Sequence, residues 1–125
     1  MMKTKFLYGI ASALFLSACG QAEPITYESV SLVNEYYIEN PVRNLVPNAG
    51  GWLFRGAHDY GDEIRVNILV LVPRSLNPDE AKRHAVLGKV CPAKSEVLWD
   101  VLPPGNKIII NVFTEDDKFK DHVIC

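Results

Sequence analysis

The N-terminal segment constrains this chain most, because it decides how many residues remain for the folded domain. Lys3 and Lys5 precede an apolar run over residues 6–16, and small residues follow it. A short basic lead, an apolar stretch of this length and small residues are typical of a secretory signal peptide. A membrane-spanning helix needs about 20 apolar residues, whereas Glu23 and Pro24 follow too soon for that length. The segment therefore predicts that the chain is exported.

Residues 16–19, Leu-Ser-Ala-Cys, resemble the lipobox of bacterial lipoproteins. In that family the cysteine is lipidated and becomes the first mature residue, which here implies removal of residues 1–18 and a lipidated Cys19. One acyl chain gives only marginal membrane binding, and the two or three chains of lipoproteins, palmitate among them, imply a durable anchor in the bilayer. Cleavage after Ala18 by an ordinary signal peptidase is the alternative, but Leu16 at its offset from the cysteine favours the lipoprotein.

The resemblance also implies a location. Gly20 stands where an aspartate would signal retention at the inner membrane in enteric bacteria, so the resemblance implies the outer membrane, with its periplasmic face as the default. Residues 19–26 form a tether that reaches at most about 20–25 Å, which keeps the domain of residues 27–125 close to the bilayer. The resemblance covers only the first 20 residues, so it implies no activity for that domain.

The mature chain has the size of one domain. Removal of the signal leaves 107 of the 125 residues, which is enough for one compact domain with a core and too few for two. Without Lys3 and Lys5, 11 basic residues oppose 15 acidic ones, a formal charge of −4. Nucleic acid and anionic lipid surfaces attract clustered basic residues. This charge balance therefore argues against both as partners.

Alternating and apolar runs predict the strands. The clearest strand is residues 64–72, whose first half alternates apolar with polar and whose second half is apolar throughout. Residues 50–55 suit a partner strand, and the glycines and Asx residues of 56–62 suit a hairpin loop between the two. Two further strands are expected at residues 107–113 and 119–125, joined by an acidic turn.

Residues 30–38 fit both a strand and a helix, but their β-branched and aromatic content favours a strand. A helix is expected from Pro78 to about residue 90, because Asn77 suits the N-cap and acidic residues follow it. A second, short helix is expected over residues 95–102. Together these elements predict the α+β class, a single disulfide-stapled domain whose antiparallel sheet carries one or two helices on one face.

Cys91 and Cys125 remain once Cys19 is assigned to the anchor. An exported chain folds in an oxidising compartment, where such a pair normally forms a disulfide. The bridge is expected to fix the end of the terminal strand to the end of a helix. A reactive or metal-binding pair is the alternative, but the sequence offers neither a CxxC spacing nor a nearby histidine to support it.

His58, Asp59 and Tyr60 are the candidate partner-binding residues, because polar loops on rigid strands often carry function. Tyr60 is the best candidate for an exposed contact, since amphipathic rings concentrate at interfaces. The same residues are also compatible with acid–base catalysis or with a plain turn. No catalytic residue, metal site or cofactor is assigned, because the sequence contains no paired histidines, calcium loop, GxSxG, SxxK or phosphate-binding motif.

The sequence leaves three functions open. The leading hypothesis is a non-enzymatic, membrane-anchored module that binds an envelope protein or an incoming one, in envelope assembly or in neutralising a toxin or phage. The second is a small cell-wall or periplasmic enzyme that uses His58, Asp59 and Tyr60. The third is a lipoprotein that binds a small ligand beneath the irregular segment 40–51. The short tether, an expected acidic face, the abundant aromatic residues and the lack of a catalytic motif favour the first.

Overall fold

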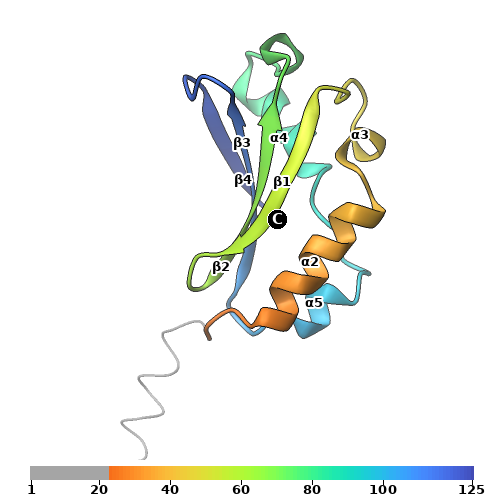
Figure 1. Cartoon of the computed structure of the whole chain (residues 1–125), viewed down its shortest axis with the longest axis vertical. Coiled ribbons are helices and arrows are strands. Elements are labelled where there is room, and N and C mark those ends of the chain that lie inside the picture. Colours follow the sequence, from red (N-terminus) through yellow and green to blue (C-terminus); the bar gives the residue numbers. More distant parts are fainter. Residues whose placement is uncertain (1–22) are drawn as a thin grey trace, which may run out of the picture.

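The structure is a computed structural model that describes residues 23–125 (Figure 1). The signal segment and Cys19 lie outside the described residues, so the expected lipidation stays a prediction. In chain order the elements are α2 (Tyr27–Glu39), α3 (Val42–Leu45), β1 (Trp52–Asp59), β2 (Glu63–Val70), the 3₁₀ helix η1 (Pro73–Ser75), α4 (Glu80–Gly88), α5 (Leu98–Val101), β3 (Lys107–Thr114) and β4 (Lys120–Ile124).

Within residues 23–125, four strands form one mixed sheet in the order β1-β2-β3-β4. β1 with β2 and β3 with β4 are antiparallel pairs, whereas the central strands β2 and β3 are parallel. Strands β2 and β3 are parallel because a crossover connects them. It runs from the end of β2 through η1, α4 and α5 and returns to the end of the sheet where β2 began. The predicted α+β class is confirmed, and the crossover makes the sheet mixed where the sequence suggested only antiparallel neighbours.

The helices cover one face of the sheet. Figure 1 shows α2, α3 and α5 along one side of the strands, and α4 contacts β4 from the same layer. The β2 and β3 side chains that point to this face are completely buried: Ile64, Val66, Ile68, Val70, Ile108, Ile110 and Val112. Successive strand residues point to opposite faces. The alternate residues therefore form a second face, called the open face below, which no helix covers within the described part of the chain.

Residues 30–38 lie within helix α2, so the prediction of a strand there is wrong. The buried residues of α2 are Ser29, Val33 and Tyr37, and their spacing of four places them on one helical face. The Thr26 hydroxyl accepts a hydrogen bond from the Ser29 N–H and caps the helix. Burial of this one face outweighs the strand preference of the β-branched and aromatic residues.

The predicted hairpin loop over residues 56–62 is too long. β1 continues to Asp59, so that His58 lies in a strand and the turn is confined to residues 60–62. A β-bulge accommodates Gly56, whose φ of 110° belongs to the left-handed region that glycine tolerates. The glycine that suggested a loop therefore marks an irregularity inside the strand.

Helix α4 begins two residues later than expected, at Glu80. The Asp79 carboxylate accepts a hydrogen bond from the Lys82 N–H, so Asp79 is the N-cap in place of Asn77. The helix ends at Gly88, close to the predicted end. The second short helix, predicted over residues 95–102, is reduced to the single turn of α5.

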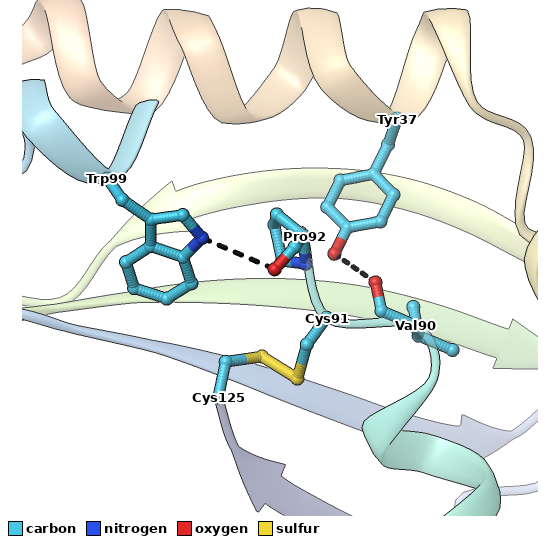
Figure 2. Close-up of a disulfide and its surroundings, with 6 residues drawn as sticks. All are labelled: Tyr37, Val90, Cys91, Pro92, Trp99 and Cys125. Carbon is cyan, nitrogen blue, oxygen red and sulfur yellow. Dashed lines mark hydrogen bonds between the residues drawn. A yellow bond between two sulfur atoms is a disulfide. The ribbon is translucent and has the colours of Figure 1, made fainter. Parts of the chain in front are cut away.

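The predicted disulfide between Cys91 and Cys125 is confirmed, with the two Cα atoms 5.5 Å apart (Figure 2). It joins the residue after β4 to the segment that follows α4. The Cys125 N–H also donates a hydrogen bond to the Ile108 carbonyl at 2.8 Å. The end of the terminal strand is thus fixed both to the crossover and to β3.

Two side chains from the helices hold the same segment of the crossover (Figure 2). The Tyr37 hydroxyl of α2 donates to the Val90 carbonyl at 2.6 Å, and the Trp99 indole N–H of α5 donates to the Pro92 carbonyl at 3.2 Å. Burial raises the pKa of Tyr37, which keeps its hydroxyl protonated and able to donate. Residues 90–92 are therefore connected to α2, α5 and β4 at once.

Replacing both Cys91 and Cys125 with serine is expected to lower the free energy of unfolding by about 3–4 kcal/mol. The reason is that a cross-link over 34 positions no longer restricts the unfolded chain. Urea unfolding of the oxidised protein measures the loss, and reduction of the wild type serves as the control that should reproduce it. An unchanged unfolding midpoint in both cases would contradict this role of the bridge.

Candidate functional site

The open face carries the strand residues that alternate with the core. Its members follow from the register of the four strands, because paired residues point to the same side of the sheet. They are Leu53, His58, Glu63, Arg65, Asn67, Leu69, Lys107, Ile109, Asn111, Phe113, Lys120, His122 and Ile124. Arg55 lies in the bulge, opposite Asn67.

The open face is basic although the chain as a whole is acidic. Arg55, Arg65, Lys107 and Lys120 oppose the single acid Glu63, a formal charge of +3 with histidine neutral. The described chain carries −4 in total, so the remaining surface carries −7. Charge is therefore segregated between this face and the rest of the domain, which the net charge alone does not reveal.

The end of the open face farther from the β1–β2 turn is apolar. Leu53, Leu69 and Phe113 lie in register across β1, β2 and β3, and Lys120 completes the row on β4. Leu53 is 42% exposed, whereas Leu69 is 8% exposed. Ile124, 60% exposed, is an accessible apolar side chain at the other end of the face, on the edge strand β4 and in the row of Arg65 and Ile109.

Two asparagines occupy the middle of the open face. The Asn111 amide donates to the Asn67 side-chain carbonyl at 3.0 Å, and His122 pairs with Asn111 on the next strand. Asparagine is depleted in strands, yet these two lie on the central strands. Sequence reasoning named neither of them. The signal that points to them is a polar residue inside each of two otherwise strongly apolar strands.

Next to this pair the face is hollowed. The hollow has a volume of about 360 Å³ and is lined by Glu63, Arg65, Ile109, Asn111 and His122. Ile109 is 8% exposed and provides an apolar wall, whereas the other four residues are polar. All five stand on strands, so the scaffold holds their positions more firmly than a loop would.

The Arg65 guanidinium is held in place on two sides. Its Nε donates to the Glu63 carboxylate at 2.6 Å, and its Cζ lies 4.0 Å above the centre of the Tyr60 ring. The Arg65 side chain remains 43% exposed. An arginine held by a carboxylate and an aromatic face is oriented while its terminal N–H groups stay accessible.

The predicted site residues do not form one cluster. His58 pairs with Arg65 on the open face, and Tyr60 lies in the turn beneath the Arg65 guanidinium with 51% of its surface exposed. Asp59 pairs with Ile64, a core residue, so it belongs to the other side of the strand. Its carboxylate accepts from the Gly61 N–H at 2.8 Å within the turn. The structure therefore brings His58 and Tyr60 to Arg65 and separates Asp59 from them.

A second polar cluster joins α4 to β4 on the helix side of the sheet. The Asp121 carboxylate accepts from Arg83 Nε at 2.6 Å and lies 2.9 Å from His84 Nε2. Burial favours the neutral acid, but the hydrogen bonds from His84 and Arg83 outweigh it and lower the pKa of Asp121. This cluster links two elements of the fold. Asp121 and its neighbour His122 point to opposite faces of the sheet.

The segment 40–51 borders a second hollow, of about 310 Å³. Its lining is mixed, with Pro47 and Trp52 beside Asn48 and Arg74. The Trp52 indole N–H donates to the Ser75 hydroxyl within this region. Small-ligand binding here stays a prediction that nothing further in the structure favours.

Within residues 23–125, no group of three or more His, Cys, Asp or Glu side chains is placed to hold a metal ion. Over the same residues, the helices are too short or too polar to cross a bilayer. Comparison of the chain with protein-family models, with curated proteins and with solved structures gives no match.

The open face is the candidate site because of its exposure, its hollow and its charge.

Substituting Asp121→Asn is expected to lower the free energy of unfolding by about 1–3 kcal/mol near neutral pH. Because the pKa of Asp121 is lower in the folded than in the unfolded state, this stabilisation is present above the unfolded value of about 4. It disappears as the pH falls through the folded value. Urea unfolding of wild type and variant should therefore differ at neutral pH and converge in acid, with the exposed Asp100→Asn as a control that is equal to wild type throughout.

The double variant Asn67→Thr with Asn111→Thr is expected to keep the wild-type stability or to gain up to about 1 kcal/mol, since threonine suits a strand better than asparagine. The matched control is Asn34→Ala, because Asn34 bonds both backbone groups of the buried Ala57. That control should lose about 1–3 kcal/mol. Thermal unfolding of both measures the contrast. A comparable loss in the threonine variant would mean that the asparagine pair is structural.

Proposed function

We propose that this chain is a non-enzymatic, membrane-anchored lipoprotein that binds another envelope protein through the open face of its sheet. The observation that carries the proposal is the one-sided architecture. The helices bury one face, and the other face presents accessible apolar, amide and basic side chains on rigid strands. Aromatic and arginine residues are enriched at protein interfaces, and Tyr60, Phe113 and Arg65 lie on or beside this face.

The position of the tether supports a partner near the membrane. The Ile25 N–H donates to the Gly61 carbonyl at 3.0 Å, and the Asn106 amide donates to the Glu23 carbonyl. The chain is thus docked at the end of the sheet that contains the β1–β2 turn and the start of β3. From Glu23 back to the proposed lipid anchor at Cys19, four residues span at most about 14 Å. The open face would therefore stand close to the outer membrane.

The exposed apolar side chains also make the open face suitable for a partner of protein chemistry. Leu53 and Ile124 flank the polar centre of the face from its two edge strands. These two side chains gain free energy when a partner buries them, and the polar centre provides hydrogen bonds that set the register of the contact. His58 and Tyr60 extend the same surface toward the turn.

A photo-crosslinking amino acid placed at Leu53 or Ile124 is expected to give a discrete adduct with one envelope protein in intact cells. The same substitution at Ile38 on α2 or at Val97 should give none, although these side chains are 71% and 61% exposed. Immunoblotting and mass spectrometry of the adduct measure the result. A Cys19→Ser variant is the anchoring control, which should leave the membrane fraction and lose the adduct.

Equal crosslinking from all four positions would point to random collision. Loss of function in a His58→Ala variant that still gives the adduct, together with turnover of an envelope substrate by the wild type, would favour an enzyme instead.

A further inference from the structure

Three of the five side chains that line the hollow beside Arg65 can donate hydrogen bonds, namely Arg65, Asn111 and His122. Within residues 23–125, the terminal Nη groups of Arg65 donate no hydrogen bond, since only Nε is used by Glu63. The Asn111 amide donates one N–H to the Asn67 side chain, and its second N–H is available for a ligand. The His122 ring lies on the same rim. Three side chains from β2, β3 and β4 thus offer donors to one small space.

The Arg65 guanidinium is oriented to bind a planar anion. Its fork of terminal N–H groups matches a carboxylate in two parallel hydrogen bonds. Glu63 and Tyr60 restrict the guanidinium on its other sides, so little side-chain entropy is lost when a ligand binds. Glu63 neutralises Arg65, but Lys107 pairs with Glu63 on the neighbouring strand and keeps the local charge positive.

The size and wall of the hollow favour a side chain as its occupant. A volume of about 360 Å³ with Ile109 as an apolar wall holds a short aliphatic stem that ends in a charged group. Phe113 lies two to four positions farther along the strands from the hollow, which corresponds to about 7–13 Å. A protein segment can therefore place an acidic residue in the hollow and an apolar residue on the Leu53, Leu69 and Phe113 row.

We propose that the hollow binds a glutamate or aspartate side chain of the protein partner, so that the partner surface is acidic with an adjoining apolar residue. This inference rests on the function proposed above and specifies its partner. Charge complementarity selects that occupant. A second copy of the chain, joined open face to open face, would bring +3 against +3. An anionic bilayer would be repelled by the formal charge of −7 on the rest of the domain.

The test is a titration of the ¹⁵N-labelled mature lipoprotein, in non-ionic detergent, with N-acetyl-glutamate N-methylamide. The expected shifts occur at the Arg65 and His122 side chains and at the Asn111 amide. The glutamine analogue of the probe should bind at least about tenfold more weakly, as should the Arg65→Gln variant, since one charge-assisted contact is worth a factor of this size. Arg74→Gln is the matched control, because Arg74 lines the other hollow.

Equal binding of the glutamate and glutamine probes, or equal loss in the Arg65→Gln and Arg74→Gln variants, would overturn the carboxylate site. If crosslinking from Leu53 persists unchanged in Arg65→Gln, the proposed function stands and this inference fails. If the titration succeeds while the wild type gives no adduct in cells, the protein-binding function fails and so does the assignment of the hollow to a protein partner. Arg65-dependent binding to phosphatidylglycerol vesicles, stronger than to the peptide probe, would likewise assign the site to lipid and overturn the protein partner.

Discussion

Residues 90–92 are the point on which the arrangement of the whole domain depends. The Tyr37 hydroxyl, the Trp99 indole and the Cys91–Cys125 bridge all hold this short segment (Figure 2). It lies in the crossover that carries the chain from the end of β2 to the start of β3. Because the crossover is fixed to α2 and α5, it returns on the side of the sheet that those helices occupy. The crossover makes the central strands parallel. Its attachment to α2 and α5 keeps the helices in one layer, and the open face stays uncovered.

Local patterns predicted the parts of this fold that depend on neighbouring residues. The strands at 64–72 and 107–113 were predicted almost to their ends, because their apolar runs are long and bounded by proline or glycine. The disulfide was predicted from export alone, since only two cysteines were left to pair. The helix at residues 30–38 was not predicted, because its apolar residues fit both the period of two residues of a strand and the period of about 3.6 residues of a helix. Only the position of the core decides between the two.

The candidate site was harder to foresee, because its residues meet only through the parallel pairing of two separate hairpins. Asn67 and Asn111 lie 44 positions apart, and nothing local to either asparagine places it beside the other. Tyr60 was predicted to be exposed and is, since it lies in the tight turn. Asp59 was grouped with it on sequence proximity, but alternation along β1 directs consecutive residues to opposite faces. The residue that lies beside both His58 and Tyr60 is therefore Arg65 and not Asp59.

The charge of the chain shows why an average over the sequence misleads about partners. A net charge of −4 argues against nucleic acid and anionic lipid as partners, yet in physiological salt a charge is felt over only about 8–10 Å. A partner therefore responds to the face it approaches, and the open face presents +3 while the other surfaces repel an acidic protein. This opposition favours one orientation of approach over the rest. With the chain held at one end of the sheet, the proposed anchor would keep the basic face within a short distance of proteins in the membrane.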